Sequence, residues 1–329
     1  MNKAKASNFK NSVFDHMLIV ILFLLVVGVS IAKPNFLSGS NFANISVNTA
    51  VRFIIALGVS GCLITKGTDL SAGRMVGLGA CIAGTLLQKA DYSDKFFKGM
   101  GDIPIPAVLL IVIAVCAMFG VANGCVVAFW KVPPFIATLG MQIVVYGLCL
   151  VYTKAVPLGG YREAYTNIAT GRFFGIPYFF IIAFVIGAFM WFLYNKTRHG
   201  KYMYAIGGNE AAAEVSGVNV SKTIILIYAS AAGLYAIAGF LLGAKAGGAS
   251  VNTGLGYELE AIAACTIGGV STNGGVGKVS GILVGVLVFE LLKSSMQFLR
   301  IDTSWQYVVQ GLVIVIAVAL DLRKYLAKK

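Results

Sequence analysis

The dominant pattern in this chain is a succession of long apolar runs separated by short polar or basic stretches. A membrane-spanning helix needs about 20 apolar residues, whereas barrel strands alternate over about 10. The runs are too long and too continuous for barrel strands, so they predict helices that cross a membrane. We place about ten of them, some short or broken by glycine, at residues 17–32, 46–65, 73–88, 106–129, 134–153, 173–194, 223–243, 257–271, 279–297 and 304–321.

The composition agrees with an all-α polytopic membrane protein. Of the 329 residues, 58% are hydrophobic and 12% are charged, about half the charged fraction of a soluble domain. The apolar runs recur along the whole length, so we expect a single transmembrane domain over residues 1–329. The lysine-rich start could be mistaken for a secretory signal, but residues 31–34 make a poor cleavage site and we expect an uncleaved first helix.

The net charge of +13 follows the predicted membrane boundaries. Lysine and arginine gather before the first run, after the last run and in a central polar segment, residues 195–222. The positive-inside rule assigns such segments to the cytoplasm, so both termini are cytoplasmic and the number of spans is even. The predicted external loops are also basic but carry acidic residues as well. The charge therefore needs no nucleic-acid partner.

The chain lacks the motifs of an enzyme or of an ATPase. The nearest match to a phosphate-binding loop, residues 272–279, has Thr272 where the motif requires glycine and Val279 where it requires serine or threonine. The six cysteines fall within or against apolar runs without a CxxC pair, and the two histidines stand far apart. We expect no catalytic residue, no metal and no cofactor.

A few polar side chains fall within the apolar runs, where they are costly and usually functional. Asp69 and Ser71 lie at a glycine-broken turn, Asn123 late in the fourth run, and Thr138 near the start of the fifth. Neutral polar groups supply both donors and acceptors, which suits a path for an uncharged hydroxylated solute. The alternative is that these groups only hold the bundle together.

Two glycine-rich stretches have similar patterns. Residues 73–77 recur as residues 277–281, and each stretch follows a polar turn and opens an apolar run. Transporters often contain such internal repeats, with broken helices near the axis. The alternative is that small residues recur in any packed membrane bundle.

The central polar segment carries the signals of a compact helix. Asn209 follows two glycines and is a good N-cap, Glu210 suits the positive end of a helix, and Gly217 is placed as a left-handed stop. The helix would have roughly two turns and measure about 10 Å, too short to be stable alone. Its alanine-rich face suits the groove of a soluble partner. The alternative is a helix that lies on the bilayer surface.

These motifs resemble those of ribose-type ABC sugar-importer permeases, and the resemblance covers essentially the full length. Within that family the pattern is most similar to the galactose/methyl-galactoside type, from Thr68 with Arg74 and from residues 305–307. The matching stretches are residues 67–73, 123–124, 134–140, 205–209, 216–220, 261–265, 268–271 and 274–277.

The resemblance implies a homodimer in the lipid of the bacterial cytoplasmic (inner) membrane that imports a monosaccharide. A separate ABC ATPase subunit, or a fused double cassette, would bind ATP and dock on a cytoplasmic coupling loop, residues 196–222. A periplasmic or lipid-anchored sugar-binding protein would deliver the sugar. By this resemblance, a docking role falls to Gly207, Gly208, Asn209, Glu210, Ala212, Glu214 and Gly217, and a substrate-pathway role to Asp69, Ser71, Asn123 and Thr138.

Two other functions stay open on the residues alone. A single-chain ion-coupled transporter needs a carboxylate at mid-membrane, and Glu290 is the candidate that lies deep in a run. Lys293 stands three residues later, so the two side chains are expected to pair on one helical face. A membrane scaffold that recruits a soluble partner without moving a solute is the other alternative.

Overall fold

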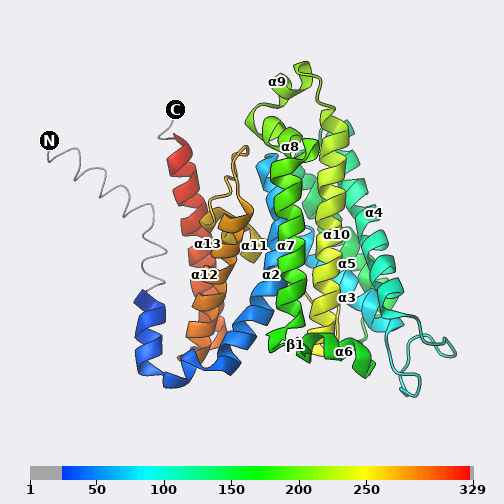
Figure 1. The fold of residues 1–329 in the computed structure, drawn as a ribbon. Helices are drawn as coiled ribbons and strands as arrows, with labels where there is room; N and C mark the ends of the chain where they lie inside the picture. Colours follow the sequence, from blue (N-terminus) through cyan, green and yellow to red (C-terminus); the bar gives the residue numbers. More distant parts are fainter. Residues whose placement is uncertain (1–23, 327–329) are drawn as a thin grey trace.

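The computed structural model describes residues 24–326 and consists of a bundle of helices (Figure 1). Residues 1–23 and 327–329 lie outside the described part, and with them the start of the first predicted span. Residues 24–32 are helical. The elements that follow are η1 (Pro34–Leu37), α2 (Gly39–Ile64), α3 (Ala72–Leu86), α4 (Ile105–Phe129), α5 (Pro134–Thr153), α6 (Glu163–Thr170), β1 (Arg172–Phe173), β2 (Ile176–Pro177), α7 (Tyr178–Lys196), α8 (Arg198–Gly208), α9 (Glu210–Val215), α10 (Val220–Ala246), α11 (Tyr257–Ile267), α12 (Val279–Phe298) and α13 (Thr303–Leu326).

Seven helices of the described chain are long and apolar enough to cross a membrane: α2, α4, α5, α7, α10, α12 and α13. The chain is therefore a multi-pass helical membrane protein. The apolar helix α3 has 15 residues and α11 has 11. At 1.5 Å per residue α11 measures about 16 Å, about half of the hydrocarbon core, so the run predicted at 257–271 does not cross as one helix.

The start of the run predicted at 173–194 is wrong. Residues 172–177 form an antiparallel pair of two-residue strands, β1 and β2, with Arg172 opposite Pro177. The turn between the strands has positive φ at Phe174 and Gly175, which a helix cannot accommodate. Helix α7 therefore begins only at Tyr178.

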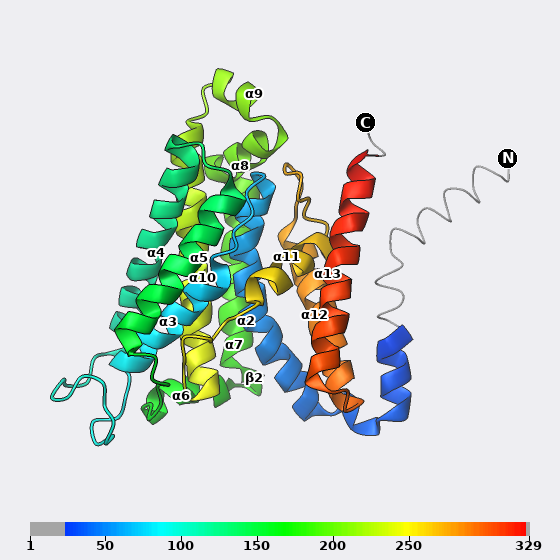
Figure 2. The same cartoon turned by 180° about the vertical axis from the view of Figure 1, so that it is seen from behind.

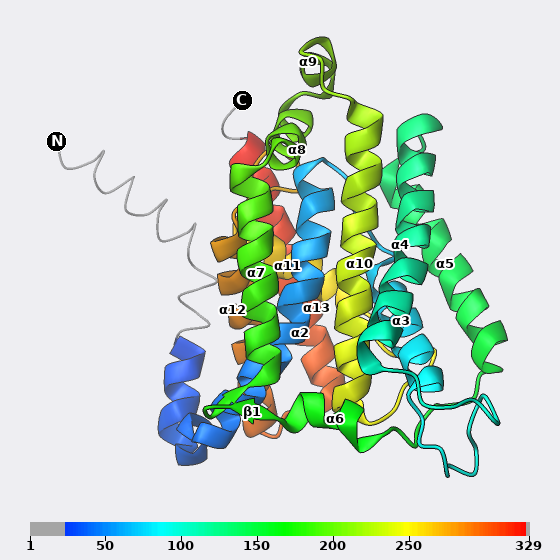
Figure 3. The ribbon, with the colours of Figure 1, turned by 45° about the vertical axis from the view of Figure 1, so that its right-hand side comes forward.

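Helices α2 and α10 form the centre of the bundle, with α7 on one side and α4 and α5 on the other (Figure 3). In the apolar 18-residue stretch of each helix, 83% of the residues of α2 and 67% of those of α10 are buried, against 22% for α4 and 17% for α5. Glycine allows α4 to approach α10 closely, because a Cβ at Gly120 would lie 2.5 Å from the carbonyl oxygen of Tyr228.

The two ends of the bundle differ in structure. Helices α8 and α9 and the last turn of α13 lie at one end, and α6 with the β1–β2 hairpin lies at the other (Figure 1). The polar turns that precede the two glycine-rich stretches are residues 66–71 and residues 268–275, which is itself rich in glycine, and they meet near the α8 end. The amide of Gly275 donates to the carbonyl of Ile64, the last residue of α2, at 2.8 Å.

Candidate coupling surface and solute path

The short helix expected after Asn209 is present as α9. The side chain of Asn209 accepts from the amide of Ala212 at 3.1 Å and so caps the helix. Gly217 has a φ of +85° and ends it, and the amide of Val218 returns to the carbonyl of Ala213 at 3.1 Å. Six residues at 1.5 Å each give a helix about 9 Å long.

One face of α9 is held by the protein and the rest is open. Ala213 is 4% exposed, whereas Val215 is 90% exposed. At the start of α9, the carboxylate of Glu210 lies 3.2 Å from the amine of Lys131, which follows α4. The open face carries the side chains of Ala212 and Glu214. This small, weakly charged surface is available to a partner.

Helix α8 seats this surface on the end of α2 and on the second glycine-rich turn. Gly207 is buried there: an added Cβ would lie 1.8 Å from the carbonyl oxygen of Ile64 and 2.5 Å from the amide nitrogen of Gly275. The hydroxyl of Tyr204 donates to the carbonyl of Gly277 at 2.8 Å. Helix α8 is thus in direct contact with the end of α2 and with the residues that precede α12.

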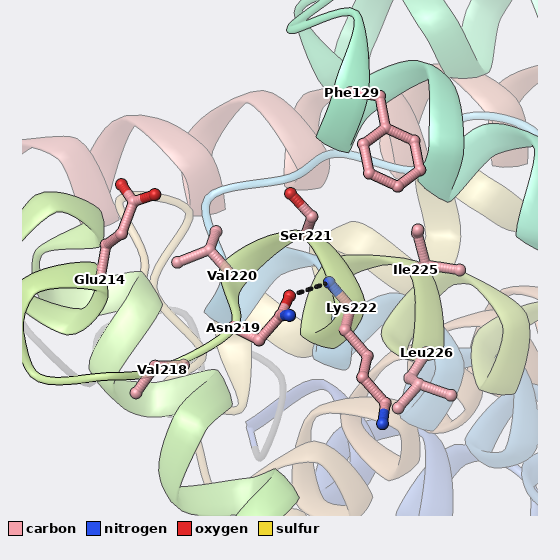
Figure 4. Close-up of a pocket in the computed structure, with 9 residues that line it drawn as sticks. All are labelled: Phe129, Glu214, Val218, Asn219, Val220, Ser221, Lys222, Ile225 and Leu226. Atoms are coloured by element: carbon pink, nitrogen blue, oxygen red, sulfur yellow. Dashed lines mark hydrogen bonds between the residues drawn. The ribbon is translucent and has the colours of Figure 1, made fainter.

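A cavity of about 570 Å³ opens beside α9. Glu214 and Phe129, the last residue of α4, lie on opposite sides of it (Figure 4). At its base, Asn219 caps α10 by accepting from the amide of Lys222 at 2.9 Å. The cavity adds a recess to the open face of α9, which a protruding side chain of a partner could enter.

The four residues assigned to the substrate pathway gather around the turn that leads into α3. The hydroxyl of Ser71 donates to Asp69 at 2.6 Å, and the side-chain amide of Asn123 donates to Ser71 at 3.1 Å. Thr138 donates to the carbonyl of Thr68 at 3.0 Å. All four side chains are buried, with residue exposures of 2% or less. In this conformation the cluster ties α4 and α5 to the turn, and its pathway role stays a prediction.

A second set of polar residues, all charged, was not predicted as a group from the sequence. Arg52 of α2 lies 2.9 Å from Glu260 of α11 and 2.9 Å from Glu290 of α12, and Lys293 lies 3.5 Å from Glu260. The expected pair of Glu290 with Lys293 is therefore wrong, because each side chain reaches a partner on another helix. Tyr257 of α11 lies beneath Arg52, with the guanidinium 5.2 Å from the ring centroid.

Arg74 of α3 makes a similar contact with a tyrosine of α5. Its guanidinium lies 4.2 Å from the ring centroid of Tyr146 in α5 and donates to the carbonyl of Val251 at 2.9 Å. Tyr146 stands eight residues after Thr138, with Gln142 between them, so all three share one face of α5. That spacing is the one sequence signal that could have revealed Tyr146.

Comparison with known proteins decides the family. Residues 41–318 match the family described as branched-chain amino acid transport system / permease component. The chain belongs to this family. It is therefore a transport-system permease and not an enzyme. No solved structure matches it.

Its similar relatives include sugar permeases. The galactose/methyl galactoside import permease protein MglC of Haemophilus influenzae is 45% identical over 331 residues, which cover 97% of this chain and 98% of that protein. MglC of Escherichia coli K12 is 45% identical over 94% of both chains. The ribose import permease protein RbsC of Bacillus subtilis is 39% identical over 92% of this chain and 91% of that protein.

Proposed function

We propose that this permease is the membrane subunit of an ATP-binding-cassette importer that carries galactose or methyl galactoside into the cytoplasm. The observation that carries the proposal is the 45% identity to permeases of that name over nearly the whole of both chains. Ribose-like sugars are the second candidate, because the relatives named as ribose permeases are 33% to 39% identical.

In this proposal, the energy for transport comes from a separate ATPase that binds α9. The support is the capped and open helix, the cavity beside it and the tight seat of α8 on α2. The permease itself needs no cofactor, because ATP is bound by the partner. The docking residues are Gly207, Gly208, Asn209, Glu210, Ala212, Glu214 and Gly217 of the coupling loop 196–222.

Two copies of one transmembrane domain, each with ten spans and an internal repeat, would form the path in the inner membrane. Asp69, Ser71, Asn123 and Thr138 would lie along it. Both termini would be cytoplasmic, and α13 ends at the same end of the bundle as α9 (Figure 1). A sugar-binding protein would dock at the opposite end, where α6 and the β1–β2 hairpin lie.

An ion-coupled transporter is less well supported. Its coupling carboxylate has to bind and release an ion at mid-membrane, and Glu290 is the candidate. Glu290 is 2% exposed and its carboxylate lies 2.9 Å from the guanidinium of Arg52. Binding of a coupling ion at Glu290 would require this buried ion pair to be broken first, and breaking a buried pair is costly.

Reconstitution in lipid vesicles tests the function. We expect labelled galactose to enter only when ATP, the ATPase and the sugar-binding protein are all present. Uptake driven by a proton or sodium gradient with the permease alone would instead establish the ion-coupled transporter. A complex that assembles with the ATPase and never moves sugar would establish the scaffold.

Co-purification tests the docking surface. Asn209→Arg together with Glu214→Arg places two bulky cations on the open face of α9, and we expect the ATPase to be lost. The matched control is Asn167→Arg with Glu163→Arg on α6, at the other end of the bundle, and it should retain the ATPase. Equal recovery of the ATPase with both double variants would refute docking on α9.

A further inference from the structure

One face of the bundle carries partly exposed charged side chains at about half of its depth. The side chains of Arg52, Glu260 and Lys293 are 12%, 12% and 23% exposed. Helix α11, which carries Glu260, lies about midway between the α9 end and the α6 end (Figure 2). An ion at this depth is costly against hydrocarbon. A face with such ions therefore turns away from lipid, toward water or toward a second copy of the chain.

The outer surfaces of α4 and α7 have the apolar composition expected of a side that faces lipid. Helix α4 contains no charged residue, and its Leu110 and Met118 are 67% and 70% exposed. Helix α7 contains no charged residue before Lys196, and its Phe184 is 68% exposed. The charged face around α11 has a different composition, so the two kinds of surface have different surroundings.

The charged face also offers two aromatic rings. Tyr146 and Tyr257 each lie beside an arginine, Arg74 and Arg52 respectively, and both rings are partly exposed. A ring presents an apolar surface to the C–H groups of a sugar, while guanidinium and carboxylate groups supply donors and acceptors for its hydroxyls. Together these groups have the chemistry that binds a neutral hydroxylated ring.

We propose that this face, defined by Arg52, Arg74, Tyr146, Tyr257 and Glu260, is the wall of the sugar path and that both tyrosines contact the sugar. The inference rests on the proposed import of a monosaccharide and adds the residues that touch it. The hollow at Arg52, Tyr257 and Glu260 has a volume of about 10 Å³, which admits a water molecule and no sugar. In this proposal a second copy of the chain would supply the opposite wall of the path.

Cysteine labelling tests where the face lies without any transport. Leu259 lies next to Glu260 in α11 and is 46% exposed. Leu259→Cys should therefore react with a water-soluble maleimide when the protein is embedded in vesicles. Met118→Cys on α4, where Met118 is 70% exposed, is the lipid-facing control and should not react beyond the wild-type chain with its six native cysteines. Equal, background labelling of both variants would overturn the proposal.

Uptake by tyrosine variants tests contact with the sugar. With both partners present, Tyr257→Ala and Tyr146→Ala should each lower galactose uptake at limiting sugar about tenfold, or ~1.4 kcal/mol. Tyr257→Phe and Tyr146→Phe keep the ring and should stay within about twofold of wild type, since stacking needs the ring face. ATPase assembly, measured by co-purification, should not change in any of the four variants.

The outcomes separate this inference from the proposed function. If the wild-type chain fails to import sugar, the proposed function is wrong. If the wild-type chain imports sugar and the alanine variants do so equally well, only the assignment of these residues to the wall of the sugar path is wrong. An alanine variant that loses uptake together with thermal stability counts against sugar contact, because the ring would then only support the fold.

Discussion

Gly207 gives the sharpest prediction, because its position permits no side chain. A Cβ at Gly207 would lie 1.8 Å from the carbonyl oxygen of Ile64, whereas ordinary contacts begin at 3.4 Å. The two backbones would have to separate by about 1.6 Å, and neither can yield by rotating a side chain. Gly207→Ala therefore lifts α8 from the end of α2.

The cost can be worked from the bonds at this contact. The separation strains the bond from Gly275 to Ile64, the bond from Tyr204 to Gly277 and the bond from Lys66 to the carbonyl of Gly208. Overpacking in a tight contact costs about 1–3 kcal/mol, and each hydrogen bond contributes about 1 kcal/mol. We expect the free energy of unfolding to fall by about 2–4 kcal/mol when α8 has to repack against the end of α2.

Function should suffer more than stability. Gly207 is buried, so its docking role would be to hold α8 in place and not to touch the ATPase. A lifted α8 still presents the exposed residues of α9, so the complex should co-purify while sugar uptake falls at least tenfold. The assays are ATP-driven uptake in vesicles, ATPase co-purification and a thermal unfolding curve. Gly140→Ala in α5 is the matched control, since an added Cβ there meets nothing within 4 Å. Wild-type uptake and stability in Gly207→Ala would refute this reasoning.

Three further predictions concern single side chains. Asn209→Ala removes the cap of α9, costs about 1 kcal/mol and should weaken ATPase co-purification, whereas Asn209→Asp, also a good cap, should preserve it. Arg52→Ala leaves Glu260 and Glu290 without their cation and should cost about 3–5 kcal/mol in thermal unfolding; an unchanged unfolding temperature would contradict the ion pairs. Burial lowers the pKa of His199 below its ordinary value of about 6.5, so stability is fully present above that pH and declines as pH falls. His199→Gln should flatten this decline in unfolding temperature, and an equal slope would refute the pKa shift.

Local signals in the sequence predicted local structure well. The apolar run predicted at 134–153 coincides with α5, and the run at 106–129 with α4 to within one residue. The cap at Asn209 and the stop at Gly217 are also confirmed, because each depends on bonds within a few residues. Such features are fixed by the hydrophobicity and backbone preference of neighbouring residues.

Long-range pairing could not be predicted in the same way. Arg52 and Glu260 are separated by 208 positions, and nothing in the sequence near Arg52 names its partner. The pair expected from spacing, Glu290 with Lys293, gave way to contacts with other helices because tertiary packing offered closer partners. The contact of Asn123 with Ser71, across 52 positions, was likewise visible only after the helices were packed together.

The seat of α8 and the close fit of α4 against α10 together determine how a push on α9 is shared. Residues 216–219 join α9 to α10, and Gly120 brings α4 into close contact with α10, so a push on α9 would reach both helices. Through Gly207 and Gly275 the same push reaches α2 and the root of α12. Because α10 also packs along α2, where a Cβ at Gly58 would lie 3.1 Å from the carbonyl oxygen of Ala231, a push on α9 would enter the centre of the bundle through two helices at once. Helices α11 and α12 pack against α2, so they would be the next to receive it.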